Sequence, residues 1–378
     1  MGTTSVRSFT THEVAERFVA HGPPLSFREL CTEVLSPKTR YLVLDLDGTI
    51  HLRRNLGELL GWELSAYRGY GLQTMERLEP GRHSARWLLD WGDPGRLFRY
   101  VFQAALAWTK PGMSYLVWGK LASRVPQLRK AGFRRFHSDP IRSAQEGVQT
   151  TLMGQLESTP DELVPILMER IWQRHRDDQV ITAEDIDWIR ANFPNTEVVL
   201  SSASPQPVVS FVAKRLDIEH AHGSTPGRIN SGEAKIEMLE SAFDDFGDPG
   251  IEIVGISDTA HGDDHCWTRY FTKVVDINSP APFPPIAPVG SPLQEVHSAT
   301  VLSREELARR ASEPEHLSPR RAHQLPGARR ELAGADLRAL MESLVQQFNA
   351  IGLGPATDPV ETAYQLSVLR ESSRDCLA

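Results

Sequence analysis

The sequence predicts an α/β protein with a Rossmann-like parallel-sheet core, an inserted helical domain and a helical C-terminal extension. Apolar, strand-like segments occur at 41–45, 196–205 and 250–258, and helical patterns follow the later ones. Strands that alternate with helices form parallel sheets. Polar residues close each of these strands, and parallel sheets bind ligands outside the carboxyl ends of their strands. We therefore expect one polar crevice along that edge.

The chain has 378 residues, of which 40% are hydrophobic and 24% charged. These values are ordinary for a globular protein. Because single cores stop growing near ~250–300 residues, we expect several units. The predicted units are an N-terminal helical extension (1–40), an α/β core (41–50 with 190–285), a helical cap (51–189) and a partly flexible C-terminal extension (286–378).

Local patterns support each unit. The segment THEVAERFVAHG (11–22) has a Thr cap, a Glu and a closing Gly, which predict a short helix. Within 51–189, apolar residues such as Leu163, Leu167 and Ile171 follow helical spacing. The proline-rich run SPAPFPPIAPVGSP (279–292) marks the predicted end of the core.

Charge and cysteine content narrow the function classes. The formal net charge of −8 gives no whole-chain reason to expect nucleic acid as a partner. The cysteines, Cys31, Cys266 and Cys376, lack the close spacing of zinc sites and suggest no disulfide framework. A reducing, cytoplasmic location is expected. No apolar run reaches the ~18 residues that a membrane span needs.

Three strand ends carry side chains suited to phosphate chemistry. YLVLDLDG contains Asp45 and Asp47, VVLSSASP contains Ser202, and IVGISD ends at Asp258. A hydroxyl group can hold phosphoryl oxygens, and a carboxylate can attack phosphorus to form an aspartyl-phosphate. A second carboxylate can protonate the leaving oxygen and later activate water. These residue types together predict phosphoryl chemistry at the crevice.

The same cluster predicts a bound cation. Two unit charges 4 Å apart repel by about 4 kcal/mol at an effective dielectric constant of 20. Several carboxylates gathered in one crevice would therefore repel strongly, and Mg²⁺ is the expected compensation. Lys235, which begins the helix before the third strand, would add a positive charge toward phosphate.

At this point the chain resembles the haloacid dehalogenase superfamily, over residues 41–285. The first motif of that superfamily is matched by Asp45-Leu46-Asp47-Gly48-Thr49, and the second by Ser202. Lys235 matches the third motif, and Ser257-Asp258 with Asp263 matches the fourth. The order SASP after the second motif is similar to the phosphoserine-phosphatase-like branch.

The resemblance implies a role for each matched residue. Asp45 would be the nucleophile and a metal ligand, and Asp47 would be the general acid/base, with its backbone carbonyl on the metal. Asp258 would bind Mg²⁺, and Asp263 would complete the metal site or orient the lysine. The residues expected to contact the substrate phosphate are Ser202, Lys235, Gly48 and Thr49. The spacing of the fourth motif also allows Asp264 in place of Asp263.

Asp47 separates reaction types. Dehalogenases of this superfamily lack the second aspartate, since a halide leaves without a proton, whereas an alkoxide needs one. A positioned acid/base contributes about 10²–10⁴ in rate. The expected function is therefore Mg²⁺-dependent hydrolysis of a phosphomonoester. Two alternatives stay open: phosphoryl transfer to another alcohol, and a membrane- or partner-binding protein that keeps the fold without useful turnover.

The lengths between motifs place the cap. Asp45 and Ser202 are 202 − 45 = 157 positions apart, whereas Ser202 and Lys235 are only 235 − 202 = 33 apart. The large insertion therefore follows the first motif. This resembles the helical-cap branch, in which the cap closes over the crevice and selects the substrate.

One part of the predicted cap is strongly basic and aromatic. Residues 95–142 contain ten Lys and Arg residues, eight aromatic residues and one acidic residue, Asp139. Such a segment can be an ordinary helical core with a solvated arginine face. It can also bind a membrane surface or a lipid phosphate, or grip another bulky anionic partner. The expected substrate is thus a phosphorylated small molecule or lipid phosphate, with peripheral membrane contact as an open alternative.

Overall fold

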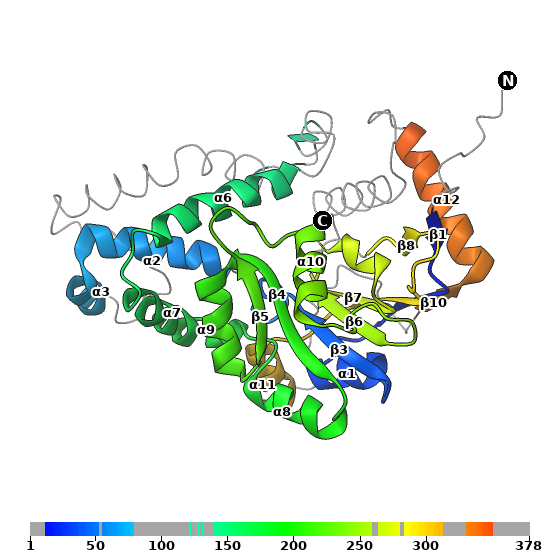
Figure 1. Ribbon diagram of the computed structural model, residues 1–378, viewed down its shortest axis with the longest axis horizontal. Helices are drawn as coiled ribbons and strands as arrows, with labels where there is room; N and C mark the ends of the chain where they lie inside the picture. Colours follow the sequence, from blue (N-terminus) through cyan, green and yellow to red (C-terminus); the bar gives the residue numbers. More distant parts are fainter. Residues whose placement is uncertain are drawn as a thin grey trace.

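A parallel sheet flanked by helices forms the centre of the protein (Figure 1). The computed structural model describes residues 12–52, 55–78, 140–258, 264–279, 283–312 and 330–350, with isolated positions between 121 and 131. Across the eight-stranded sheet the order is β10 (Arg330–Ala333), β2 (Arg17–Ala20), β9 (Glu295–Ala299), β7 (Lys273–Ile277), β6 (Glu252–Ser257), β3 (Thr39–Leu44), β4 (Glu197–Pro205) and β5 (His220–Ser224). Only the β10–β2 pair is antiparallel in this described sheet. The predicted α/β class is confirmed.

The helices cover both faces of this sheet. They are α1 (Phe27–Val34), α2 (Leu56–Tyr70), α3 (Leu72–Leu78), α6 (Pro140–Leu156), α7 (Leu163–Arg174), α8 (Ala183–Asn192), α9 (Gln206–Leu216), α10 (Glu233–Ala242), α11 (Arg304–Ser312) and α12 (Gly334–Ala350), with 3-10 helices η4 (Arg176–Asp178) and η5 (His265–Arg269). Strand β3 shows the alternation that makes two cores. Leu42 and Leu44 pack with α1, α8 and α9, whereas Tyr41 and Val43 pack with α10 and η5.

The chain order creates a switch point at β3. From β3 the chain moves to β4 and β5 on one side, and then returns to β6 and β7 on the other. Side chains at the carboxyl ends of β3, β4 and β6 therefore come together, as parallel sheets require at such a point.

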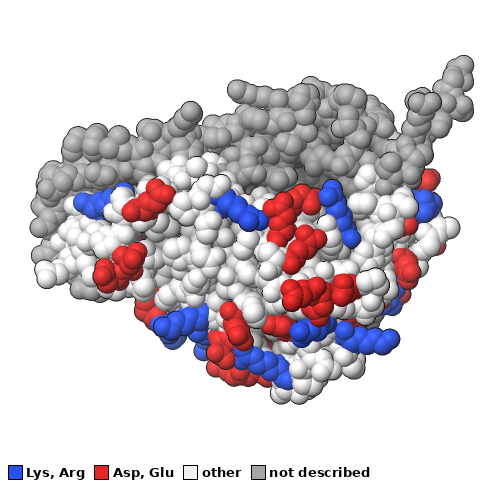
Figure 2. All heavy atoms as spheres, in the orientation of Figure 1, with Lys and Arg blue, Asp and Glu red and all other residues white. Residues whose placement is uncertain are grey.

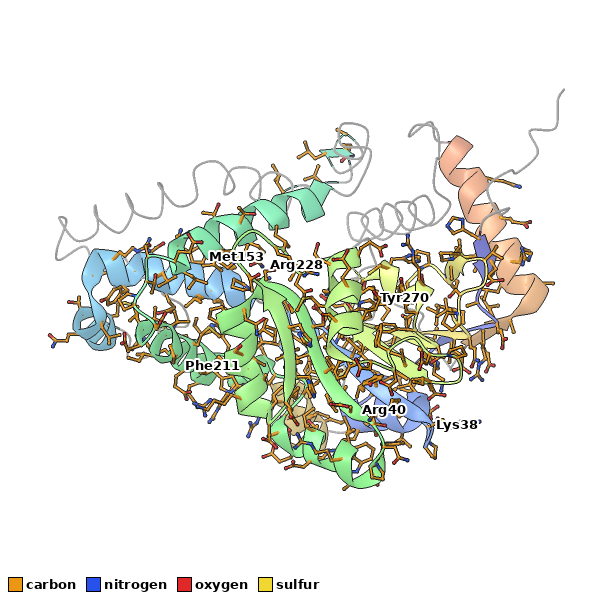
Figure 3. All side chains as sticks on the ribbon, viewed as in Figure 1. Lys38, Arg40, Met153, Phe211, Arg228 and Tyr270 are labelled. Carbon is orange, nitrogen blue, oxygen red and sulfur yellow. The ribbon has the colours of Figure 1, made fainter. Side chains whose placement is uncertain are left out.

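A block of helices, α2, α3, α6 and α7, lies at one end of the sheet (Figure 1). A buried ion pair joins two of them, because Arg174 donates to Glu63 at 2.6 Å and Glu63 is only 1% exposed. Phe211 of α9, labelled in Figure 3, meets Trp172 of α7 edge to face, with ring centroids 6.3 Å apart. The described part of 51–189 is mainly helical and packs against α9 of the core.

Two connections link this helical block to the core, and they run side by side. The amide of Leu52 donates to the carbonyl of Asp178, and the amide of Val180 donates to that of Ile50, both at 2.9 Å. The helix α11 approaches the same place, since the Arg304 amide donates to the Gln179 carbonyl at 2.7 Å. A short backbone-paired strip thus joins the helices to the sheet.

The prediction of a helix over 11–22 is wrong. These residues instead form β1 (His12–Val14) and β2, and the first helix of the described chain is α1. Ser26 and Glu29 make a capping box at the start of α1, so this helix begins after the segment in which a helix was predicted. Strand β2 lies between β9 and β10, so contacts distant in sequence override the local helical signal.

The predicted core boundary at residue 286 also differs from the structure. Beyond it, β8 (Ile286–Pro288) pairs with β1, and β9 enters the main sheet as a parallel strand beside β7. Val296 and Ala299 of β9 are buried in the two cores. Residues 295–299 therefore belong to the core rather than to an extension. The prolines between β7 and β9 interrupt the sequence patterns of helices and strands, but the core domain continues after them.

The basic and aromatic segment 95–142 lies outside the described residues, apart from isolated positions and the start of α6, and its predicted partners stay predictions. In the described part of the chain, no helix combines the length and apolarity of a membrane span. On the face drawn in Figure 2, Lys and Arg side chains of the described residues alternate with Asp and Glu. That face therefore carries both signs of charge in small groups.

Candidate active site

The first carboxylate stands where β3 leaves the sheet. The Asp45 amide donates to the Ile256 carbonyl of β6 at 3.0 Å, which extends the β3–β6 pairing by one residue. Asp45 is only 5% exposed. A rigid strand end thus holds a buried carboxylate, which is the placement that the sequence predicts.

A tight turn follows Asp45. The Leu46 carbonyl accepts the amides of Thr49, Ile50 and His51 at 2.9–3.3 Å, so residues 46–51 form a tight hydrogen-bonded turn. Gly48 adopts φ of +82°, a region that side chains rarely enter. A Cβ atom built on Gly48 would lie 1.7 Å from Oδ2 of Asp258. The missing side chain of Gly48 therefore lets the fourth motif approach the first.

Lys235 occupies the centre of the site. Its Nζ lies 3.0 Å from Oδ1 of Asp45 and 2.5 Å from Oδ1 of Asp264, and the lysine is 1% exposed. Its ammonium group also stands 5.2 Å from the ring centroid of Trp267, a distance at which a cation is attracted to the ring face. The third predicted motif thus meets the first directly.

The structure places the fourth-motif alternative, Asp264, on this lysine. Asp264 is fully buried, and it also accepts a short hydrogen bond from Ser257. Asp263 lies outside the described residues, and its predicted metal role stays a prediction. Of these two aspartates, Asp264 is thus the one that contacts Lys235 in the described part of the chain.

Asp47 is held by three donors. Its Oδ1 accepts the backbone amide of Leu56 at 2.7 Å, and its Oδ2 accepts Asn55 Nδ2 at 3.0 Å and Ser204 Oγ at 2.6 Å. Asn55 caps α2 through the amide of Glu58. The carboxyl group of Asp47 therefore joins the end of β4 to the first turn of the helical block.

The predicted phosphate-binding hydroxyls have different surroundings. Ser202 is 2% exposed, and its Oγ accepts the amide of Ser204 at 3.2 Å. The described contacts put Ser204, and not Ser202, on Asp47. Thr49 is fully buried, and its Oγ1 has no hydrogen-bond partner in the described part of the chain. The phosphate contacts of Ser202, Gly48 and Thr49 stay predictions.

Burial and mutual repulsion shape the electrostatics. Burial raises the pKa of Asp45 to about 7, Asp264 and Asp47 add to the rise, and Lys235 opposes it. Burial raises the pKa of Asp47 to about 6, against the hydrogen bonds from Ser204 and Leu56. Burial also raises the pKa of Asp258 well above its ordinary value, and Asp45 adds to this. Each rise marks a carboxylate that lacks enough positive charge around it.

The residues fit a magnesium ion. Oδ1 of Asp258 is buried and has no hydrogen-bond partner among the described residues, which leaves an acceptor available to a cation. Asp45, Asp258 and the Asp47 carbonyl are hard oxygen donors of the kind that Mg²⁺ prefers, with water in its other positions. Within the described ranges, no three His, Cys, Asp or Glu side chains form a complete metal-ligand group by themselves. A magnesium ion held by two side chains, a carbonyl and waters does not require one.

Sequence reasoning missed two residues of this site. Ser204 and Asn55 contact Asp47, yet neither matches a motif. Ser204 stands two positions after Ser202, and residues two apart on a strand face the same side. Strand β4 continues to Pro205 instead of ending at Ser202, so that alternation was the signal that could have found Ser204.

No family model and no curated protein matches the sequence. Solved structures show a weak likeness. A protein of unknown function from Bordetella pertussis Tohama I is 14% identical, with 64% of this chain and 91% of that chain covered and a TM-score of 0.37. A phosphoserine phosphatase, solved as a phospho-aspartyl intermediate analogue, is 12% identical, with coverages of 64% and 87% and a TM-score of 0.32. A HAD-superfamily hydrolase of subfamily IA from Geobacter sulfurreducens PCA is 11% identical, with coverages of 72% and 95% and a TM-score of 0.29. Likeness at this level supports no argument about activity.

Substitution of Gly48 by alanine tests the contact between the first and fourth motifs. If Mg²⁺ binds between these motifs and raises the melting temperature, we expect Gly48→Ala to abolish that rise, because the new methyl group displaces the Asp258 carboxylate. The matched control is Gly71→Ala. Gly71 has φ of +75° and ψ of 156°, with open space around its Cβ position, so that variant should lose about 1–3 kcal/mol of folding free energy and keep any Mg²⁺ response. Equal Mg²⁺ responses in both variants would contradict a metal site that depends on the approach of Asp258 to Gly48.

Proposed function

We propose that this chain is a Mg²⁺-dependent phosphomonoesterase of the haloacid dehalogenase superfamily, in its phosphoserine-phosphatase-like branch. One observation carries the proposal: Lys235 bonds the Asp45 carboxylate at 3.0 Å, while the Asp258 carboxylate lies against Gly48 of the same motif. Three motifs that are far apart in the sequence thus meet at the carboxyl ends of neighbouring parallel strands.

In the proposed reaction, Asp45 attacks the phosphorus atom of the ester. The bond between phosphorus and the ester oxygen breaks, and that oxygen takes a proton from the Asp47 carboxyl group, so that an alcohol leaves. A water molecule then gives a proton to the Asp47 carboxylate and attacks the aspartyl-phosphate. The bond between phosphorus and Asp45 breaks, which releases phosphate and restores both aspartates.

The other groups of the site act by holding charge. Lys235 would bind a phosphoryl oxygen, and Asp264 would keep the lysine in place. A magnesium ion on Asp45, Asp258 and the Asp47 carbonyl would neutralise the oxygens that gain charge during transfer. The rigid strand ends supply the fixed geometry that such stabilisation needs.

We propose that the helical block α2, α3, α6 and α7 is the cap that selects the substrate. Two features support this proposal. Both connections to the core lie together at 50–52 and 178–180, which is the arrangement that lets an inserted unit move as one body. In addition, Asn55 at the start of α2 contacts Asp47, so the position of this unit would bear on the reacting group.

Hydrolysis of p-nitrophenyl phosphate and of a panel of sugar, amino-acid, nucleotide and lipid phosphates tests the proposed function. We expect phosphate release with Mg²⁺, none with EDTA, and recovery when Mg²⁺ is restored. Asp47→Asn should lower turnover of alkyl esters by about 10²–10⁴, since it removes the general acid. A wild-type protein that hydrolyses no ester of the panel with Mg²⁺ would contradict the proposal.

A further inference from the structure

The side chain of Ser204 contacts Asp47, the proposed general acid/base. Ser204 is 1% exposed and stands at the end of β4, and its Oγ donates to Oδ2 of Asp47 at 2.6 Å. Strands β3 and β4 are parallel neighbours with Leu44 opposite Leu200. The chain therefore reaches Asp47 three residues past this pair on one strand and Ser204 four residues past it on the other, which brings the two side chains together.

The hydrogen bonds on Asp47 are distributed unequally. A carboxylate offers about two acceptor positions on each oxygen. On Oδ2 both are taken, by Ser204 and Asn55, whereas Oδ1 accepts only the Leu56 amide among the described donors. The remaining acceptor position is thus on Oδ1. When the Asp47 carboxyl group is protonated, Oδ1 is therefore the oxygen that carries the proton.

We infer that Ser204 is a positioning residue that, with Asn55, occupies Oδ2 of Asp47 and so assigns the transferable proton to Oδ1. The inference rests on the proposed function, because it concerns the acid that protonates the leaving oxygen. Asn55 and Leu56 belong to the helical block, whereas Ser204 belongs to the sheet. Ser204 therefore holds the carboxyl group in the frame of Asp45 and Lys235.

Removal of this hydroxyl should impair protonation of the leaving group and spare the rest of the reaction. The value of kcat/KM reports the first transfer step, in which the ester bond breaks. Phenyl phosphate needs a proton for its leaving oxygen more than p-nitrophenyl phosphate does, since nitrophenolate is the more stable anion. We expect Ser204→Ala to lower kcat/KM for phenyl phosphate about tenfold and for p-nitrophenyl phosphate less than about threefold.

Ser224→Ala is the matched control. Ser224 is also 1% exposed and lies beside the end of β4. Its hydroxyl donates to the Ala203 carbonyl at 2.7 Å and accepts the Asn230 backbone amide at 2.9 Å. It does not contact Asp47 through either bond. This variant should change both esters by one common factor, as a purely structural serine would.

The outcomes separate the two proposals. A selective loss on phenyl phosphate in Ser204→Ala, absent from Ser224→Ala, supports the role of Ser204. A common factor for both esters in Ser204→Ala overturns it while the proposed function stands. A wild-type protein without turnover of either ester contradicts the proposed function itself. If Ser204→Ala does not fold, Ser204→Cys replaces it, since a thiol keeps nearly the same volume and is a weaker donor, and the same criterion applies.

Discussion

Asp45→Asn should reduce release of phosphate from p-nitrophenyl phosphate by a factor on the order of 10⁴–10⁶, the range seen when a covalent catalyst loses its reacting group. An amide oxygen is a poor nucleophile. The loss of the carboxylate charge would also weaken binding of Mg²⁺ at the proposed site. The fold should survive, because asparagine has nearly the same shape and Lys235 keeps its bond to Asp264. Steady-state rates with Mg²⁺ give the first measurement.

The intermediate gives a second measurement. Acid-quenched wild-type protein should carry a phosphate adduct detectable by intact mass, and Asp45→Asn should carry none. Asp276→Asn is the matched control, since Asp276 is also a buried aspartate, 2% exposed and near the end of strand β7, which β6 separates from β3. It should keep activity within about tenfold. Turnover of Asp45→Asn near that of the wild type would exclude Asp45 as the nucleophile.

Lys235→Met should lower the free energy of unfolding by about 3–5 kcal/mol when measured in EDTA at neutral pH. The lysine is the cation between Asp45 and Asp264, and all three side chains are buried. Without the lysine, the buried carboxylates of Asp45 and Asp264 lose the positive charge that lies between them. Urea unfolding followed by circular dichroism measures the loss.

Two further variants show whether charge is the cause. Lys273→Met removes a lysine that is 3.4 Å from Glu252 and donates to the Val34 carbonyl at 3.1 Å, and it should lose only about 1 kcal/mol. The double variant Lys235→Met with Asp264→Asn should recover part of the larger loss, because one of the uncompensated carboxylates is gone. Equal losses in Lys235→Met and Lys273→Met would contradict the proposed charge balance.

The sequence predicts the site better than the outer sheet, for a physical reason. The strand ends at Asp45 and Asp258 follow apolar runs that read as buried strands, and Lys235 begins a helix with clear periodicity. These are local signals. Parallel pairing then brings their ends together by topology alone, so their meeting could be inferred without any knowledge of contacts.

Strands β2, β9 and β10 gave no comparable signal. Each is short, and β2 reads as part of a helical pattern when seen alone. Their stability comes from pairing across the sheet and from side chains such as Arg17, which bonds both Glu295 and Glu331. The prediction named Ser202 and did not include Ser204, which contacts Asp47. Ser204 matches no motif, so the resemblance offered no reason to select it.

The place of β2 has a consequence for how the chain is made. Arg17 pairs with Glu295 and Glu331, which follow it in the chain by 278 and 314 positions. A ribosome releases the amino end first, so β2 emerges long before β9 and β10 exist. During that interval its edges have no partners in the sheet, and contacts at such separation form slowly. Strand β2 is therefore among the last to join the sheet, and synthesis that stops before residue 295 leaves it exposed to aggregation.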